Sequence, residues 1–127
     1  MLSVLKVGTV LIIDDNDAIR RLVSKILERE GLRVEESPDG QDALAKLETG
    51  SYDAIILDLM MPLTTGFEVI SALRKSRPEL LRKVIVMTAA MSKLDSTDLE
   101  GVGAVVSKPF EIDNLIGTLR KCLDLEI

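Results

Sequence analysis

The sequence predicts a doubly wound α/β domain, in which helices cover both faces of a parallel β-sheet. Short apolar runs alternate with amphipathic segments along the chain, and four of the five runs have no polar residue in their interior. Strands that are apolar on both sides are typical of a parallel sheet buried on both faces, and helices usually connect such strands. The 127 residues suffice for one domain with a core of its own.

Five segments are expected to form the strands of this sheet. The second of them alternates apolar and charged residues, which is typical of a half-exposed edge strand, whereas the others read as buried strands. The expected strands are residues 9–13, 32–36, 54–57, 84–87 and 104–106.

Helices are expected after each strand, and capping residues mark the ends of the first two. Apolar residues at helical spacing follow the first strand, with Asn16 or Asp17 as the N-cap and Gly31 as the end of the helix. The second helix opens at residues 37–40 and ends near Gly50.

The three later helical segments differ in the strength of their pattern. Residues 65–68 have the spacing of a capping box, which predicts a helix start. Residues 90–101 carry so many Ser, Thr and Asp residues that only a weak helical pattern remains. The last segment has one apolar stripe at helical spacing, formed by Ile112, Leu115, Ile116, Leu119, Cys122 and Leu123.

Composition excludes several classes of function. The chain has no His, so imidazole metal ligands, Ser/His triads and histidine phosphoacceptors are absent. The formal net charge of −5 argues against direct binding of a nucleic-acid backbone. Cys122 is the only cysteine, so no disulfide framework exists and a reducing cytoplasm is the expected location. No apolar run approaches membrane-spanning length.

Polar residues follow the buried strands at the points where the strands end. They are Asp14-Asp15, Asp58, Thr88 and Lys108. Because the carboxyl ends of parallel strands meet at one edge of a sheet, where α/β folds bind ligands, these side chains are expected to lie together. Each alone has an ordinary explanation as a turn, a cap or a solvated charge, but the combination of all of them at one edge favours a functional site.

The acidic members of this group predict a metal site. Two carboxylates about 5 Å apart repel by roughly 3 kcal/mol, which would raise one pKa by about 2 units. A hard divalent cation removes this conflict, and an all-oxygen set of ligands completed by water suits Mg²⁺. Rival phosphate-binding chemistries are disfavoured, because no strand is followed by a P-loop or a complete dinucleotide fingerprint. A haloacid-dehalogenase-like phosphatase would have an Asp-x-Asp pair at the position of Asp58, and Asp58-Leu59-Met60 does not provide one.

These motifs, taken in order, resemble the receiver domain of bacterial two-component response regulators. The resemblance covers nearly the whole chain and implies one receiver domain over residues 1–127 with a core of about 9–123. It also implies a flavodoxin-like parallel sheet with strand order 2-1-3-4-5. It rests on Asp14-Asp15, the run Leu57-Asp58-Leu59-Met60-Met61-Pro62 with Gly66 beyond it, Thr88-Ala89-Ala90 and Lys108-Pro109-Phe110.

The resemblance implies a metal site and a phosphoacceptor. Asp58 would be the nucleophile that accepts a phosphoryl group from a phosphohistidine. Asp15, Asp58 and the backbone carbonyl of Met60 would bind Mg²⁺, or Mn²⁺ as a substitute, and Asp14 would bind it through a water molecule. Thr88 would donate its hydroxyl to a phosphoryl oxygen as the switch residue.

The remaining roles concern charge, partners and output. Lys108 would pair with another phosphoryl oxygen, and a cis Lys108–Pro109 bond would aim the lysine into the site. The phosphodonor would be a sensor histidine kinase or a histidine phosphotransfer protein. Receivers typically bind this partner through the helix that here carries Ile19, Arg20 and Leu22. Of these three residues, Leu22 is expected to lie in the core. The fourth helix, fifth strand and last helix would form the face that controls a downstream protein or effector domain.

The sequence departs from the family pattern at two informative positions. Val105 stands three residues before Lys108, where the family usually has Tyr or Phe, so an aromatic rotamer switch is not available. Met60, two residues after Asp58, has no amide or carboxylate to orient water, which predicts a long-lived phosphoryl group. A family dimer mode is not carried over, because residues 90–103 are shorter and more polar than the usual fourth helix.

Three functions remain in competition. The first is a phosphorylatable receiver, which catalyses its own phosphorylation and dephosphorylation but turns over no outside substrate. The second is a pseudo-receiver, a protein-binding module without phosphoryl chemistry. The third is a metal-dependent phosphatase, which is weaker because no general acid is apparent. The cognate kinase, the oligomeric state and whether the receiver stands alone are left open by the sequence.

Overall fold

The predicted parallel sheet is present. The computed structural model describes residues 8–89, 94 and 97–123. All five strands pair in parallel, in the order β2-β1-β3-β4-β5, which confirms the predicted fold class. The elements in chain order are β1 Thr9–Ile13, α1 Asp17–Arg29, β2 Arg33–Ser37, α2 Gly40–Thr49, β3 Ala54–Asp58, α3 Gly66–Ser76, the 3₁₀ helix η1 Pro78–Lys83, β4 Val84–Thr88, β5 Ala104–Ser107 and α4 Ile112–Cys122.

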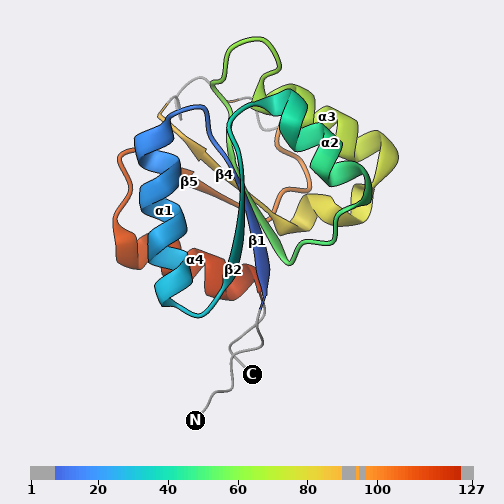
Figure 1. Ribbon diagram of the computed structural model, residues 1–127. Helices are drawn as coiled ribbons and strands as arrows, with labels where there is room; N and C mark the ends of the chain where they lie inside the picture. The colour runs from blue at the N-terminus through green and yellow to red at the C-terminus, as the bar shows by residue number, and fades with distance from the viewer. Residues whose placement is uncertain (1–7, 90–93, 95–96, 124–127) are drawn as a thin grey trace.

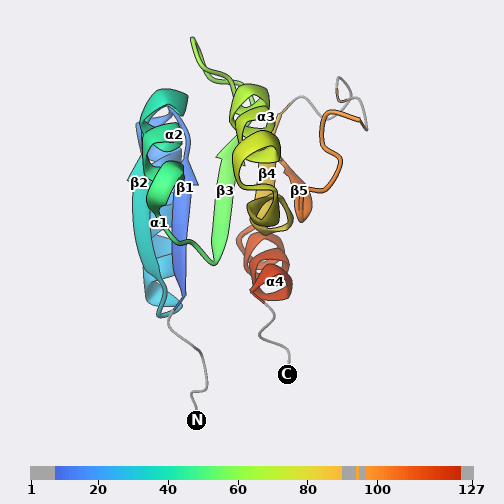
Figure 2. The ribbon, with the colours of Figure 1, turned by 90° about the vertical axis from the view of Figure 1, so that its right-hand side faces the viewer.

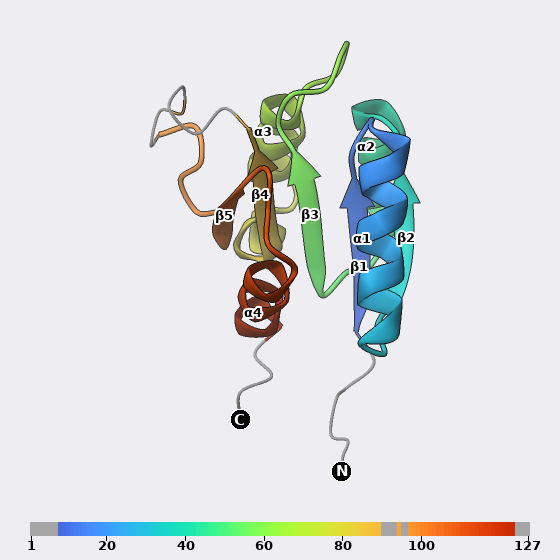
Figure 3. The ribbon, with the colours of Figure 1, turned by 90° about the vertical axis from the view of Figure 1, so that its left-hand side faces the viewer.

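Helices cover both faces of the sheet (Figure 1). One face carries α2 and α3 and is turned toward the viewer in Figure 2. The opposite face carries α1 and α4 and is turned toward the viewer in Figure 3. Each face has its own apolar cluster, with Leu11 and Ile55 on the α2–α3 side and Ile12 and Ile56 on the α1–α4 side. Successive residues of a strand point to opposite faces, so a strand buried between two helical layers is apolar at every position.

The predicted caps position the helices. Asn16 is the N-cap of α1, and its side chain accepts a hydrogen bond from the amide of Ile19, which decides between Asn16 and Asp17. Asp39 caps α2 in the same way. Thr65 and Glu68 form the predicted capping box at the start of α3. Short polar side chains thus satisfy free helical amides at the starts of α1, α2 and α3, whereas α4 begins without a side-chain cap.

The prediction for Leu22 was wrong. Its side chain is 50% exposed, whereas the buried residues of α1 are Arg20, Val23, Ser24 and Leu27. These positions follow the i, i+3, i+4, i+7 spacing of one helix face, and Leu22 lies beside that face. A buried arginine therefore occupies the place in the helix period that an apolar residue was expected to fill.

The described residues of the expected helix between β4 and β5 are not helical. Residues 97–101 form turns rather than a helix. Residues 90–93 and 95–96, which belong to the same expected segment and include Ala90 of the family motif, lie outside the described residues. Arg74 of α3 donates hydrogen bonds to the carbonyl oxygens of Glu100 and Asp98, so side-chain contacts with α3 hold residues 98–100.

Candidate functional site: an acidic cluster at the carboxyl edge of the sheet

The polar residues that follow the strands meet at one edge, as the sequence predicted. Asp14 comes directly after β1, and Asp58 and Thr88 are the last residues of β3 and β4. The strands β1, β3 and β4 are neighbours in the sheet, and their carboxyl ends lie at the upper edge in Figure 3. The strand order thus places residues far apart in the sequence beside one another.

Three carboxylates form the centre of the site. One oxygen from each of Asp14, Asp15 and Asp58 lies within 4.8 Å of the other two. Asp14 and Asp58 are 4% and 6% exposed, while Asp15 reaches solvent. Carboxylate oxygens gathered this closely are the ligands that a hard divalent cation such as Mg²⁺ prefers. The donor set therefore fits a hard cation.

Lys108 lies against this cluster. Its Nζ is 2.9 Å from Oδ2 of Asp14 and 3.5 Å from Oδ2 of Asp58. The Lys108–Pro109 bond is cis, as expected. The amide of Lys108 donates to the carbonyl oxygen of Thr88, which ties the β5–α4 loop to the end of β4. The ammonium group compensates part of the negative charge, and it lies closer to Asp14 than to Asp58.

The surroundings of Asp58 raise the pKa of its carboxyl group to about 6. Burial is the largest cause, because it disfavours the charged form, and the negative charges of Asp14 and Asp15 act in the same direction. The Lys108 ammonium and a hydrogen bond from the Met60 amide to Oδ1 of Asp58 lower the pKa in part. A cation bound here would remove most of the electrostatic conflict that burial creates.

A close approach of the backbone fixes the loop after Asp58. A Cβ atom on Gly66 would lie 2.5 Å from the carbonyl oxygen of Asp58 and 2.6 Å from Cα of Leu59. The amide of Gly66 donates to the carbonyl oxygen of Leu59. Only glycine allows α3 to begin this close to β3, a role that the sequence signalled only through the family motif.

The match to a family model decides the identity of this fold and site. The model of the response regulator receiver domain matches residues 10–120. The chain belongs to this family. The parallel sheet with order β2-β1-β3-β4-β5 and the acidic cluster at its carboxyl edge agree with this family, and the resemblance recognised from the sequence motifs is confirmed.

Relatives and solved structures agree with the family. The transcriptional regulatory protein TrcR of Mycobacterium tuberculosis is 34% identical over 116 residues, covering 90% of this chain and 44% of the relative. The response regulator protein TrrA of Thermotoga maritima, in complex with Mg²⁺-BeF, matches with a TM-score of 0.83 and 31% identity, covering 91% of this chain and 98% of that chain. A complex of histidine kinase ThkA with TrrA matches with a TM-score of 0.81 and 32% identity, covering 91% and 98%.

The receiver chain spans about half the length of the curated relatives it matches. Within residues 8–89, 94 and 97–123, no helix has the length and apolar composition that crossing a bilayer requires.

Two further positions distinguish this receiver. Val105 is partly buried, pairs with Val86 in register and packs on the α2–α3 side, so an aliphatic residue fills the place of the usual aromatic. Arg20, expected on the surface that faces a kinase, is only 7% exposed and bonds within the domain. The sequence did not indicate this burial, because arginine is rarely buried unless several acceptors surround it.

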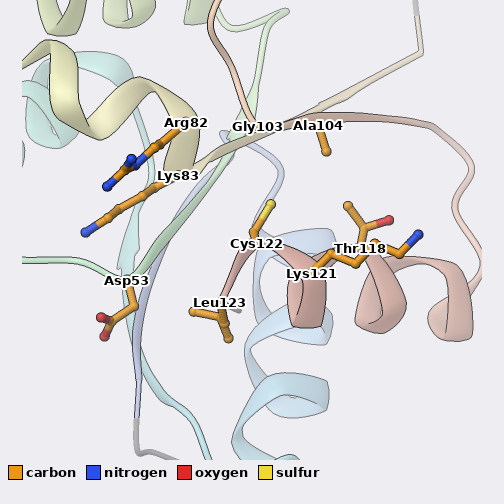
Figure 4. A pocket seen from close by; sticks show the side chains of 9 residues that line it. All are labelled: Asp53, Arg82, Lys83, Gly103, Ala104, Thr118, Lys121, Cys122 and Leu123. Carbon is orange, nitrogen blue, oxygen red and sulfur yellow. The ribbon is translucent and has the colours of Figure 1, made fainter. Parts of the chain in front are cut away.

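A hollow of about 800 Å³ lies at the opposite, amino end of the strands (Figure 4). It is lined in part by Arg82, Lys83, Lys121 and Cys122. Arg82 and Lys83 extend to one side of the view, whereas the end of Lys121 extends to the other side. The charged groups do not converge on a common point, so this hollow lacks the arrangement seen at the acidic cluster.

Proposed function

We propose that this receiver domain accepts a phosphoryl group on Asp58 in a Mg²⁺-dependent reaction. The donor is the phosphohistidine of a sensor histidine kinase or a histidine phosphotransfer protein. The observation that carries the proposal is the convergence of three carboxylates and Lys108 at the end of β3. A structural role alone would not favour three carboxylates so close together, because their mutual repulsion weakens the fold.

In the proposed reaction, a carboxylate oxygen of Asp58 attacks phosphorus in line with the leaving group. The P–N bond of the phosphohistidine breaks, and its electron pair remains on the imidazole nitrogen. Such a transfer requires positioning and charge stabilisation more than covalent chemistry from the protein. The hydrogen bond from the Met60 amide holds Oδ1 of Asp58 at 3.2 Å, which leaves Oδ2, beside Lys108, as the attacking oxygen.

Asp15, Asp58 and the Met60 carbonyl would hold the Mg²⁺ ion, with Asp14 acting through a water molecule. The ion would neutralise charge on the transferred group. Mn²⁺ has similar oxygen ligands and would substitute for it. The structure of TrrA in complex with Mg²⁺-BeF supports this assignment by analogy.

Thr88 and Lys108 would change position when Asp58 is phosphorylated. Lys108 would move from Asp14 toward a phosphoryl oxygen, and the Thr88 hydroxyl would donate to another. Thr88 ends β4 and Lys108 directly follows β5, so their movement would alter the surface formed by residues 97–102, β5 and α4. That surface would control a downstream protein or an effector domain.

Under the proposed function, residues 1–127 would form one receiver domain with a core of about 9–123. This domain would work in the cytoplasm. The kinase complex of TrrA supports a kinase partner by analogy. The net charge of −5 gives this domain no reason to bind nucleic acid directly, although matched relatives are transcriptional regulatory proteins.

Intact-mass measurement tests the proposal. The protein is incubated with Mg²⁺ and acetyl phosphate, beside Asp58→Ala and beside a sample with excess chelator. One phosphoryl adduct is expected in the wild-type protein only, and only with Mg²⁺. No adduct with acetyl phosphate or a phosphorylated kinase would make the chain a binding module. Turnover of unrelated phosphate esters would make it a phosphatase.

A further inference from the structure

Arg20 joins three elements beside the acidic cluster. Its Nη1 donates to the carbonyl oxygen of Asp14 at 2.8 Å, just after β1. Its Nε donates to Glu36 of β2 at 2.8 Å, and its Nη2 donates to Asp17, the first residue of α1, at 2.7 Å. In Figure 3, α1 lies over β1 and β2. The bonds of Arg20 therefore join α1 to the end of β1 and to β2. Every nitrogen of the buried guanidinium thus has an acceptor.

The bond to Asp14 bears directly on Asp15. The carbonyl group of Asp14 and the amide of Asp15 belong to one rigid peptide plane. A hydrogen bond to that carbonyl therefore fixes the direction in which the chain leaves β1. The amide of Asp14 donates to the carbonyl oxygen of Ser37, and the amide of Asn16 donates to Oδ1 of Asp14. The backbone on both sides of Asp15 is held in this way.

Asp15 has no comparable support of its own. Among the contacts of the described residues, its carboxylate makes no hydrogen bond and no ion pair, and it is exposed to solvent. Even so, one of its oxygens lies within 4.8 Å of oxygens of Asp14 and Asp58. The backbone conformation is therefore what places this carboxylate in the cluster.

We infer that Arg20 is a positioning residue for cation binding, which holds the Asp14–Asp15 peptide so that the Asp15 carboxylate faces Asp58. The inference rests on the proposed function, because it assigns Arg20 a role at the proposed Mg²⁺ site. Arg20 touches neither the ion nor the phosphoryl group. It acts through the peptide that carries Asp15.

Electrostatics alone predicts that replacement of Arg20 would strengthen Mg²⁺ binding, which is the opposite of what a positioning role predicts. Arg20 is a cation near the acidic cluster, and its removal would also free the charges of Asp17 and Glu36. Both changes would attract Mg²⁺ more strongly. A role in positioning instead predicts weaker binding when Arg20 is replaced. The direction of the change in affinity therefore separates the two explanations.

The test compares Mg²⁺ binding by the wild-type protein and by Arg20→Gln. Isothermal titration of the metal-free proteins gives the dissociation constant, and phosphorylation by acetyl phosphate is followed as a function of Mg²⁺ concentration. Loss of a group that orients metal ligands typically weakens binding by about 10- to 100-fold, and about tenfold is expected here. The Mg²⁺ concentration for half-maximal phosphorylation should rise equally, while the rate at saturating Mg²⁺ stays within about twofold.

Three variants serve as controls. Arg21→Gln removes the neighbouring exposed arginine of α1 and should leave the affinity unchanged. Val23→Ala weakens the same helix from its buried face without removing a hydrogen bond to the Asp14 carbonyl, and should also leave it unchanged. Arg20→Lys keeps the charge but cannot donate to all three acceptors, and an intermediate loss of affinity is expected. This variant also keeps the test decisive if Arg20→Gln does not fold.

The outcomes separate failure of the inference from failure of the proposed function. If the wild-type protein neither binds Mg²⁺ nor becomes phosphorylated, the proposed function is wrong. If it does both, and the affinity of the Arg20 variants is unchanged or higher, the positioning role is wrong. A loss of affinity in Val23→Ala equal to that in the Arg20 variants would likewise overturn it, since general loosening would then explain the effect.

Discussion

The two edges of the sheet both carry charged side chains, but only one of them brings the charges together. At the carboxyl edge, Asp14 and Asp58 are buried, and Lys108 bonds across the gap between β1 and β5. At the amino edge, Arg82, Lys83 and Lys121 line a hollow of about 800 Å³, and the charged end of Lys121 extends away from those of Arg82 and Lys83 (Figure 4). The size of a hollow thus says less about function than the convergence of its polar groups.

The difference follows from how each edge is built. Short loops follow β1, β3 and β5 at the carboxyl edge, and hydrogen bonds join each loop to a neighbouring element. The cations of the amino edge come from the end of η1 and the last turn of α4. Arg82 and Lys121 are exposed, whereas Lys83 is partly buried and donates to the carbonyl oxygen of Tyr52. Four predictions test whether convergence, rather than charge alone, makes the carboxyl edge reactive.

The largest expected effect concerns the stability of the metal-free protein. The pKa of Asp58 is about 6 in the folded state, above the value of 3.8 for a free carboxyl, so the folded state binds more protons between these values. The contribution of Asp58 to stability therefore falls as pH rises from 4 toward 7. The free energy of unfolding of Asp58→Asn, minus that of the wild-type protein, should rise by roughly 2–3 kcal/mol over this interval.

Urea unfolding at several pH values measures this difference. Glu48→Gln removes an exposed carboxylate from α2. Its free energy of unfolding, minus that of the wild-type protein, should not show this rise between pH 4 and 7. Saturating Mg²⁺ should reduce the pH dependence of the Asp58 difference, since the cation compensates the ionised carboxylates. A flat difference in the metal-free protein would show that Asp58 is not electrostatically strained.

Lys108→Gln should slow phosphorylation by acetyl phosphate by about a hundredfold, because the reaction loses a positioned charge beside Oδ2 of Asp58. Lys83→Gln at the amino edge should leave the rate unchanged. The rate of adduct formation under saturating Mg²⁺ gives both values. Equal small effects of the two variants would mean that the overall charge of the domain, rather than placement, controls the rate.

Two glycines give a matched test of the backbone beside Asp58. Gly66→Ala should destabilise the fold by about 1–3 kcal/mol, because its Cβ would lie 2.5 Å from the Asp58 carbonyl oxygen. Gly117→Ala in α4 meets no atom within 4 Å and should stabilise the fold by about 0.5–1 kcal/mol. Thermal or urea unfolding measures both. The same sign for the two variants would contradict the close approach at Gly66.

The smallest effect is expected at Met60. Its side chain is 57% exposed beside Asp58 and offers no hydrogen-bonding group to orient a hydrolytic water. Met60→Asn should shorten the lifetime of the phosphoryl group several-fold, as followed by the decay of the adduct after removal of the donor. Met60→Leu is the matched apolar control and should change the lifetime little. Unchanged or slower decay in Met60→Asn would count against this role.

The sequence predicted the sheet because short, uninterrupted apolar runs separated by amphipathic segments are typical of parallel strands buried on both faces. It predicted the members of the candidate site for a related reason, since parallel strands bring their carboxyl ends together whatever the side chains are. Asn16 and Thr65 were recognisable as caps because their spacing to the helix is local. These features depend on neighbours in sequence or on topology.

The features that the sequence did not predict depend on long-range contacts. Burial of Arg20 requires Glu36, which is 16 residues away, and the carbonyl of Asp14. Once Arg20 takes the buried position on α1, Leu22 is left beside the packed face, and apolar spacing alone could not distinguish the two. The same holds for residues 98–100, which are held by Arg74 of α3 rather than by a helical pattern of their own.

The position of Lys108 has a consequence for how metal and phosphoryl group influence each other. With three carboxylates and one lysine, the metal-free cluster carries a formal charge of about two negative units. A phosphoryl group on Asp58 would add roughly one more. Mg²⁺ would therefore bind the phosphorylated site more tightly than the resting site. By thermodynamic reciprocity, the same factor would favour the phosphorylated form when Mg²⁺ is bound, so each ligand would act as a positive effector of the other.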